Sequence, residues 1–334
     1  MTTLLSNPSI FDPPTATPAE RLAIARLMAD CFVFAYPEDP PLVLEQEAAG
    51  LSFVTPGEKT EHVVVWEGGQ VLAWGMLEYS LEQNLHLARA RLLVHPEVRR
   101  RGLGRRVAEH LISQARQAGR TTLTFVTTDR APAGQPFAEE LGAAPAITDR
   151  RSQLNLAAVS TELLDAWLSR PAGEAYQLHL WQTYPEAYLE RMAQMVMVMN
   201  TAPRGELDYD DWKITPETLR TWEQQIHEVG EVRWTAVIED TQSGELVGYS
   251  EIYWTPQRAS AVDQGATAVR PSERGRGLGK WLKAALTRQI LQQCSGAQFI
   301  RTSNANENAA MLGINVAMGF EPFSEQTEWQ LHLI

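Results

Sequence analysis

Two short stretches of this 334-residue chain combine arginine with closely spaced glycines. One is Arg99-x-x-Gly102-x-Gly104 and the other is Arg274-x-x-Gly277-x-Gly279. When such a stretch links a strand to a helix, backbone N–H groups cluster at the helix N-terminus, and glycine lets a bulky anion approach them. Arginine and lysine side chains add charge-assisted hydrogen bonds. Each stretch therefore predicts a pyrophosphate site.

Two familiar pyrophosphate motifs do not fit these stretches. A P-loop requires G-x-x-x-x-G-K-[ST], but Arg274 stands where its first glycine belongs and Trp281 follows Lys280. A dinucleotide fingerprint requires a third glycine, and its place is taken by Lys280 in the second stretch and by Val107 in the first. Both nucleotide-binding classes are excluded on these grounds.

The two stretches belong to a longer internal repeat. Residues 93–105 and 268–280 share the pattern Val-x-Pro-x-x-Arg-x-Arg-Gly-Leu-Gly-basic. The offset is constant, because Val94 and Val269 are 175 positions apart and so are Gly102 and Gly277. Agreement at this many positions indicates a duplicated domain.

The elements that must position the glycine stretches repeat in the same order. Each half predicts a hairpin, a third strand, the glycine stretch, a helix with apolar residues at helical spacing, and a buried strand. The expected strands are 63–67, 71–79, 85–94 and 121–127 in the first half, and 235–239, 246–253, 261–269 and 298–303 in the second. We predict an α/β fold of two tandem domains, each with a central, mixed but mostly antiparallel sheet flanked by helices.

The expected boundary between the halves is a short linker. Ser169-Arg-Pro-Ala-Gly173 has the composition of a loop. A single cut near residue 170 gives an N-terminal domain, 1–170, and a C-terminal domain, 171–334. Residues 186–200 and 216–229 are expected to form the opening helices of the second domain.

The glycine stretches resemble the pyrophosphate-binding motif of the GNAT superfamily of N-acetyltransferases. The segment Asn308-Ala-Ala-Met-Leu-Gly-Ile-Asn-Val-Ala-Met-Gly-Phe320 is similar to that family's late helix. The tandem arrangement and the segment Met199–Gly205 resemble mycothiol synthase-like and other tandem members. The resemblance implies an acyl-CoA-dependent N-acyltransferase that uses acetyl-CoA as co-substrate and acetylates a primary amine of a small molecule.

The resemblance also implies which residues bind the co-substrate. Acetyl-CoA would lie between strands 261–269 and 298–303, with its pyrophosphate on the glycine stretch and Asn308 reaching it from the late helix. The residues implied in the second half are Val269, Arg274, Gly275, Arg276, Gly277, Leu278, Gly279, Lys280 and Asn308. Their counterparts in the first half are Val94, Arg99, Gly102 and Gly104.

The chain departs from the family pattern at the late helix. Asn315 stands where many members have a tyrosine that protonates the departing thiolate, and Ala138 stands there in the first half. A thiol with a pKa of about 8.5 departs as the thiolate without much help, so the missing tyrosine weakens the enzyme interpretation only modestly. We expect the C-terminal half to be catalytic and the N-terminal half to be degenerate. A silent acyl-CoA sensor or scaffold and a protein-lysine acetyltransferase are the alternatives.

Amide formation from a thioester requires a neutral amine, whose ordinary pKa is about 10.4, so a general base is needed. Glu251 and Asp263 are the candidates, and the resemblance to tandem members such as mycothiol synthase implies a catalytic carboxylate near the position of Asp263. Glu206 and Asp208 lie in an acidic loop that is expected to contact the acceptor. Solvated surface carboxylates are the alternative in every case.

Composition narrows the functional class further. The net charge of −12 argues against a nucleic-acid partner. Basic residues concentrate around the two glycine stretches, among them Arg270, Lys280 and Lys283 in the second. The sequence contains no run of about 18 apolar residues, so we predict no membrane span. The His and Cys residues do not have the spacing of a metal site, so we predict no bound metal. The two distant cysteines and the absence of a signal sequence predict a cytoplasmic protein, either a monomer or a homodimer.

Overall fold

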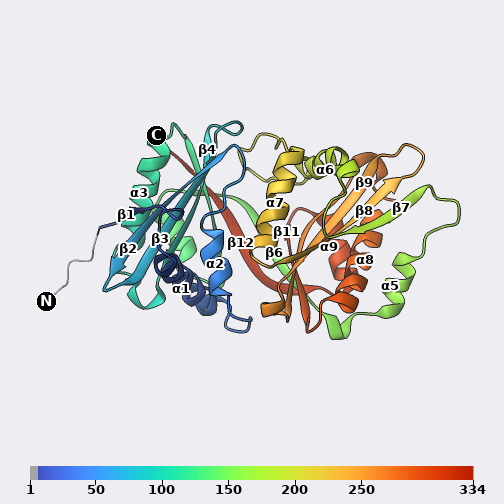
Figure 1. Cartoon of the computed structure of the whole chain (residues 1–334), viewed down its shortest axis with the longest axis horizontal. Helices are drawn as coiled ribbons and strands as arrows, with labels where there is room; N and C mark the ends of the chain where they lie inside the picture. The colour runs from blue at the N-terminus through green and yellow to red at the C-terminus, as the bar shows by residue number, and fades with distance from the viewer. Residues whose placement is uncertain (1–6, 334) are drawn as a thin grey trace. The chain divides into compact units, whose positions relative to one another are not determined.

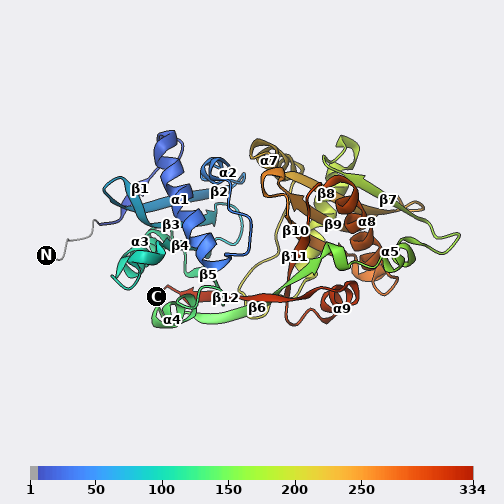
Figure 2. The ribbon, with the colours of Figure 1, turned by 90° about the horizontal axis from the view of Figure 1, so that it is seen from below.

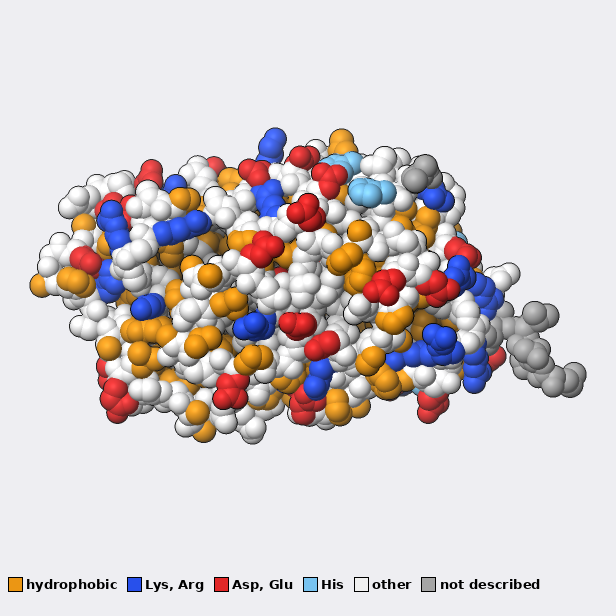
Figure 3. Space-filling view, turned by 180° about the vertical axis from the view of Figure 1, so that it is seen from behind, with side chains coloured by type: hydrophobic (Ala, Val, Ile, Leu, Met, Phe, Trp, Pro, Cys, Tyr) orange, Lys and Arg blue, Asp and Glu red, His pale blue; other side chains and the backbone are white. Residues whose placement is uncertain are grey.

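The computed structural model describes residues 7–333 and divides the chain into two units (Figure 1). Unit 1 consists of Met1–Thr148, Gly205–Asp210 and Glu325–Ile334. Unit 2 consists of Asp149–Arg204 and Asp211–Ser324. None of the helices in the described residues is long and apolar enough to cross a membrane. Acidic side chains are spread over the face shown in Figure 3 rather than gathered into one patch.

The sheet of unit 1 has the strand order β1-β2-β3-β4-β5-β12. Neighbouring strands are antiparallel except β4 and β5, which are parallel. The strands are β1 (Ser9–Phe11), β2 (Glu58–Glu67), β3 (Gln70–Ser80), β4 (Leu87–Val94), β5 (Thr122–Thr128) and β12 (Glu321–His332). The helices are α1 (Pro18–Ala35), α2 (Leu44–Gly50), α3 (Leu103–Gln117) and α4 (Gly134–Glu140), with a single 3₁₀ turn, η1 (Pro96–Val98), before α3.

Alternating side chains of β2 send apolar groups to both faces of this sheet, as the two-residue period of a strand requires. Val63 packs in a core with Leu111 of α3, whereas its neighbour Val64 packs in a separate core with Leu27 of α1 and Trp74. Figure 2 shows α1 and α2 on the opposite side of the strands from α3. Unit 1 is therefore a helix–sheet–helix sandwich.

The sheet of unit 2 has the strand order β6-β11-β10-β9-β8-β7, antiparallel except for the parallel pair β10 and β11. The strands are β6 (Ala144–Asn155), β7 (Tyr176–Trp181), β8 (Val232–Asp240), β9 (Leu246–Trp254), β10 (Ala261–Val269) and β11 (Phe299–Ala305). The α-helices are α5 (Thr161–Leu168), α6 (Leu189–Val196), α7 (Pro216–Glu228), α8 (Leu278–Gln293) and α9 (Ala309–Met318). The 3₁₀ turns are η2 (Leu156–Ala158), η3 (Glu186–Tyr188), η4 (Met197–Thr201), η5 (Pro256–Arg258) and η6 (Pro271–Glu273).

The two faces of this second sheet are also covered by different helices. Ile238 of β8 packs in a core with residues of α5 and α8, and its neighbour Val237 packs in a core with residues of α6 and α7. The expected fold, an α/β chain with a mixed, mostly antiparallel sheet in each half, is confirmed. Each half also has the expected order of three antiparallel strands, glycine loop, helix and parallel strand.

The last strand of each sheet comes from the other half of the sequence. β12, at the end of the chain, pairs with β5 from Gln326↔Thr128 to His332↔Thr122. The 149–155 part of β6 pairs with β11 from Ala305↔Asp149 to Phe299↔Asn155. Residues 149–170 therefore belong to unit 2 and residues 325–334 to unit 1, so the division differs from a single cut near residue 170. Alternation along a strand predicts its faces, but it does not predict which distant strand it pairs with.

A third piece of unit 1 is the short segment 205–210. The amide of Asp208 donates to Gln330 Oε1 at 2.7 Å, and the amide of Asp210 donates to Asn84 Oδ1 at 2.6 Å. Gly205 has a φ of +53°, and a Cβ at this position would lie 2.3 Å from the carbonyl oxygen of Ala146. Only glycine fits this close approach without displacing the backbone.

Replacing Gly205 with alanine is therefore expected to destabilise the protein by about 2 kcal/mol or more, because the left-handed backbone and the contact with Ala146 both oppose a side chain. Gly313→Ala is the matched control. Gly313 lies inside α9 with nothing within 4 Å of the Cβ position, so this change should stabilise the helix by about 0.5–1 kcal/mol. Urea denaturation measures both, and equal effects at the two positions would contradict the prediction.

Candidate active site

The glycine loops of the two units have the same backbone conformation. In unit 2, Gly275 has a φ of +81° and Gly277, the N-cap of α8, a φ of +76°. In unit 1, Gly102 is the N-cap of α3 with a φ of +79°, and Arg100 adopts the left-handed conformation at +63° although it carries a side chain. Arg100 stands 175 positions before Gly275. The repeat therefore extends to individual dihedral angles.

The first arginine of each motif braces the loop against the preceding strand. Arg274 donates Nε to the carbonyl of Val269 at 3.1 Å, and Arg99 makes the same bond to Val94 at 3.2 Å. Arg274 Nη2 also donates to the hydroxyl of Thr201 at 2.6 Å. These arginines hold the loop in shape, which leaves the backbone amides at the helix start as its principal anion donors.

Space around the loops distinguishes their glycines. Nothing lies within 4 Å of the Cβ position of Gly102 or Gly275, whereas a Cβ at Gly279 would meet Ile314 of α9 at 3.2 Å and one at Gly104 would meet Phe137 at 3.6 Å. Gly279 therefore allows α8 and α9 to pack closely, whereas a Cβ at Gly104 would make an ordinary van der Waals contact. Gly102, Gly275 and Gly277 are the glycines whose conformation shapes the anion site.

Side chains that the motif does not contain also reach the loop of unit 2. Arg170 donates Nη2 to the carbonyl of Arg276 at 3.1 Å, and its Nη1 lies 3.3 Å from the Cβ position of Gly277. Arg276 donates Nη1 to the hydroxyl of Tyr176 at 2.8 Å. Arg170 thus places a guanidinium at the helix N-terminus from the segment predicted to be a linker. No local motif marks it, because its position depends on the fold of unit 2.

Two other residues of the predicted basic cluster differ in exposure. Lys280 is exposed, with Nζ 5.3 Å from the centroid of the Trp167 ring. Lys283 is only 1% exposed, its Nζ has no hydrogen-bond partner among the described residues, and it lies 5.2 Å from the centroid of the Phe320 ring. Burial lowers the pKa of Lys283 to about 7. Lys283 therefore belongs to the core of unit 2 and not to the anion site.

Replacing Lys283 with methionine is expected to stabilise the protein by about 4–5 kcal/mol near neutral pH, because folding lowers the pKa from 10.5 to about 7 and each pKa unit corresponds to about 1.4 kcal/mol. The folded-state pKa of about 7 lies below the ordinary value of 10.5, so folding penalises the protonated amine. The penalty is largest below about pH 7 and disappears as the pH rises towards about 10.5. Urea denaturation across this range should show the two proteins converging at high pH, and a constant difference would contradict the prediction.

The parallel strand pair of each unit separates next to the glycine loop. β10 and β11 pair only from Ala261↔Phe299 to Gln264↔Thr302, although both strands continue further. β4 and β5 pair only from Leu87↔Thr122 to Arg89↔Thr124. Val269 and Val94 lie beyond these paired parts, and on this side their carbonyls accept the hydrogen bonds of Arg274 and Arg99.

A β-bulge is present at this point in unit 2. Gln264 pairs with Ile252 and Thr267 pairs with Ser250, so Gly265 and Ala266 together oppose the single residue Glu251. The ladder between β3 and β4 in unit 1 runs without interruption. Bulges redirect side chains and leave main-chain groups unpaired, and they are common beside active sites.

Glu251 lies opposite the bulge and is 9% exposed. Its Oε1 accepts a hydrogen bond from the hydroxyl of Tyr184 at 2.8 Å and its Oε2 accepts one from Tyr253 at 3.4 Å. Burial raises the pKa of Glu251, and the positive charge of Arg233 and the tyrosine hydrogen bonds oppose this rise. A carboxyl group held in this way is suited to accept a proton near neutral pH.

Glu251 lines a cavity of about 210 Å³ on the α6 and α7 side of the sheet. The cavity is open to solvent on one side and is lined mainly by aromatic and aliphatic side chains from β8, β9, the end of α6, α7 and the segment between β7 and η3. The lining residues are Tyr184, Val196, Leu219, Trp222, Gln225, Ile226, Arg233, Glu251 and Tyr253. Of these, the sequence predicted only Glu251.

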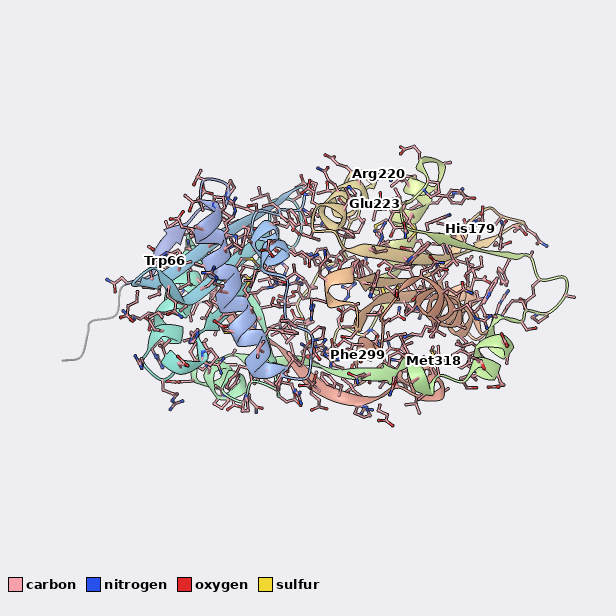
Figure 4. The ribbon with its side chains drawn as sticks, turned by 60° about the horizontal axis from the view of Figure 1, so that its bottom comes forward. Trp66, His179, Arg220, Glu223, Phe299 and Met318 are labelled. Carbon is pink, nitrogen blue, oxygen red and sulfur yellow. The ribbon has the colours of Figure 1, made fainter. Side chains whose placement is uncertain are left out.

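Glu251 is also the inner end of a row of alternating charges. Arg233, 3% exposed, has Nη1 4.0 Å from Glu251 Oε1 and donates Nη2 to Glu223 Oε1 at 2.7 Å. Arg220 contacts Glu223 at 2.5 Å and the exposed Glu186 at 2.6 Å. Figure 4 shows Arg220 and Glu223 close together on α7. Each buried charge has an opposite neighbour, which reduces the cost of burying Glu251 as an anion.

Comparison with known proteins assigns most of the sequence to a known family. The acetyltransferase (GNAT) family matches residues 21–143 and 181–320. This chain belongs to the GNAT acetyltransferase family. The two matched regions lie in the two halves of the sequence repeat, and GNAT acetyltransferases use acetyl-CoA as co-substrate.

Individual relatives support the assignment. Mycothiol acetyltransferase of Mycobacterium leprae (strain Br4923) is 25% identical over 282 residues, which cover 82% of this chain and 85% of that protein. A tandem GNAT protein from the clavulanic acid biosynthesis pathway has 26% identity and a TM-score of 0.80 over 98% of both chains. A GCN5-related N-acetyltransferase from Sphaerobacter thermophilus shares the fold, with 17% identity and a TM-score of 0.67 over 99% of this chain and 97% of that one. The chain is an N-acetyltransferase with two GNAT repeats.

The late helix of the second GNAT repeat is α9. Asn308 is its N-cap, and its Oδ1 accepts a hydrogen bond from the amide of Met311 at 3.3 Å. Asn315, 1% exposed, donates Nδ2 to Asn304 Oδ1 at 2.6 Å. Asn315 thus ties α9 to β11, and an amide cannot supply the proton that a tyrosine would.

The other predicted acidic residues lie apart from the cavity lining. Asp263 is exposed on β10 and pairs in register with Tyr253. Asp208 has its main-chain oxygen 2.8 Å from His86 Nε2, and the carbonyl of Glu206 accepts a hydrogen bond from Gln330 Nε2 at 2.8 Å. The 205–210 segment that carries Glu206 and Asp208 is part of unit 1 of this GNAT chain.

The first GNAT repeat differs at the corresponding places. Met76 stands 175 positions before Glu251, so unit 1 has no carboxylate there. The hydroxyl of Tyr209 lies 3.1 Å from Thr124 Oγ1, at the last paired position of β5, and donates to Glu328 Oε1 at 3.1 Å. Burial raises the pKa of Tyr209. A tyrosine side chain thus contacts β5 and β12 beside the point where β4 and β5 begin to separate.

Proposed function

We propose that unit 2 transfers the acetyl group of acetyl-CoA to a primary amine of a small molecule, with Glu251 as the general base. The observation that carries the proposal is the position of Glu251, which faces a cavity and lies opposite the β10 bulge where the parallel strands separate. The names of the relatives in the comparisons, a mycothiol acetyltransferase among them, support acetyl transfer.

The residues of unit 2 divide the work of this reaction. The amides of Gly275 to Lys280, together with Arg170, would bind the pyrophosphate at the positive end of α8. Main-chain groups near Val269 would pair with the extended arm of the co-substrate, and those of the bulge would stabilise the developing oxyanion. Glu251 accepts the proton of the attacking amine, and the hydroxyls of Tyr184 and Tyr253 orient its carboxylate.

The absence of a tyrosine at position 315 leaves the thiolate without a side-chain acid from α9. A thiol with a pKa of about 8.5 can depart as the anion near neutral pH, so the reaction does not require that acid. The difference between the units also supports a division of labour, because unit 2 has Glu251 opposite the β10 bulge, whereas unit 1 has Met76 at the corresponding position and an uninterrupted ladder between β3 and β4.

The direct test is release of free CoA thiol from acetyl-CoA in the presence of a panel of primary amines. Amine-dependent release, with an acetylated product in mass spectrometry, is the expected result. Tight binding of acetyl-CoA without turnover of any amine would support the sensor alternative. Transfer only to lysines of a protein substrate would overturn the small-molecule part of the proposal.

A further inference from the structure

The cavity beside Glu251 also carries information about the acceptor, on the assumption that the proposed function is correct. All its lining residues belong to unit 2, and they come from segments as far apart as Tyr184 and Tyr253. The carboxylate lies on the strand side of the cavity, and the side chains of α7 face it. An amine that reaches Glu251 from the cavity must therefore leave its carbon skeleton against α7.

The volume of the cavity limits the enclosed part of the acceptor. An apolar cavity of about 150 Å³ is large enough to bind benzene, and this one measures about 210 Å³. It can enclose a single ring or a short branched chain together with the amine. A disaccharide or another two-ring skeleton would extend beyond the cavity through its open side.

The walls of the cavity favour an apolar skeleton. Trp222, Ile226 and Leu219 face it from α7, and Val196 faces it from the end of α6. The rings of Tyr184 and Tyr253 complete the wall, while their hydroxyls are directed to Glu251. Aromatic rings bury large apolar areas and stack on other rings at specific angles. A skeleton rich in hydroxyl groups would lose its water here at about 1–3 kcal/mol for each unmatched group.

The charges of the cavity are balanced before a ligand enters. Arg233 lies between Glu251 and Glu223, and its guanidinium stacks on the ring of Tyr184 at 4.0 Å. The ammonium group of the acceptor can pair with Glu251 in place of part of its contact with Arg233. It then transfers a proton to the carboxylate of Glu251. A second charge on the skeleton would face apolar walls, and an unpaired buried charge is strongly unfavourable.

From these four observations we propose that the acceptor is a monoamine whose skeleton is one aromatic ring or a short branched alkyl group without a second charge. Phenethylamine and isoamylamine are the simplest probes of this class. Spermidine represents the polycations, glucosamine the polar amines, and methylamine reports the chemistry without filling the cavity.

The experiment measures thiol release from acetyl-CoA for each probe, and the binding of phenethylamine by calorimetry without acetyl-CoA. We expect kcat/KM for phenethylamine and isoamylamine to exceed that for spermidine and glucosamine by about tenfold or more. Ile226→Trp fills the cavity and should lower the phenethylamine to methylamine ratio of kcat/KM by about tenfold or more. Leu291→Trp is the matched control, because Leu291 is 48% exposed on α8 and does not line the cavity.

The outcomes separate this inference from the proposed function. Efficient turnover of spermidine or glucosamine in preference to the apolar amines would overturn the acceptor class and leave acetyl transfer standing. An unchanged amine ratio in Ile226→Trp would also overturn it. Binding of phenethylamine that Ile226→Trp abolishes, without thiol release from any amine, would support the cavity assignment and overturn the proposed function. Neither binding nor turnover of the apolar amines would overturn the inference.

Discussion

Replacement of Gly277 by glutamate is expected to lower kcat/KM for acetyl-CoA by about 100-fold or more. The new carboxylate would stand at the positive end of α8 and repel the pyrophosphate, at a cost of about 1–2 kcal/mol. A side chain at Gly277 also blocks the close approach of the pyrophosphate to the backbone amides, and a lost hydrogen bond to a charged group costs about 1.5–3 kcal/mol. Together these costs correspond to about 100-fold in affinity.

Gly102→Glu is the matched control, because Gly102 is the N-cap of α3 with a φ of +79°. The two variants carry the same charge change and the same left-handed backbone strain, and they differ in that the Cβ of residue 277 lies 3.3 Å from Arg170 Nη1 whereas nothing lies within 4 Å of the Cβ of residue 102. We expect Gly102→Glu to retain most of the activity, since unit 1 has Met76 at the position that corresponds to Glu251. An inactive Gly102 variant beside an active Gly277 variant would place the catalytic site in the other unit.

Replacement of Glu251 by glutamine is expected to lower kcat/KM by about 10²–10⁴-fold, the usual contribution of a general base. Glutamine keeps the shape of the side chain but cannot accept the proton of the amine. The pH profile gives a second readout. The base must be ionised, so wild-type activity should fall as the pH drops through the raised pKa of Glu251, and this acid limb should disappear in the variant.

Asp263→Asn is the comparison that discriminates between the two predicted carboxylates. Asp263 is exposed at the start of β10 and does not line the cavity, so its replacement should change kcat/KM by much less and should retain the acid limb. A variant of Asp263 that loses the acid limb, together with an active Glu251→Gln variant, would reverse the assignment of the base. Steady-state kinetics between about pH 5 and about pH 9 measure both.

Several features of the site could be predicted because their causes are local. A glycine stretch between a strand and a helix permits only a few conformations, so the repeated motif predicted both loops and their position at helix N-termini. Strand alternation and helical spacing likewise predicted the order of the elements in each half. Glu251 was a candidate because its residue type and strand placement were both visible in the sequence.

Other features depended on contacts between distant residues. Tyr184, Trp222 and Arg233 carry no motif, and they become a cavity only when α7 packs over β8 and β9. Arg170, assigned to a linker, reaches the glycine loop of unit 2 because residues 149–170 fold with that unit. These residues were not predicted, since proximity in the folded chain leaves no local pattern in the sequence.

The amino-acid sequence by itself determined the duplicated domain, the two anion loops and the family resemblance, because steric limits on short segments act within a few residues. The tertiary structure alone decided that β12 completes the sheet of unit 1 and β6 that of unit 2. It also decided that Lys283 is buried while Lys280 is exposed, although both follow the same motif. Strand partners and burial are set by packing across the whole sheet, where the free energy of many distant contacts selects one arrangement.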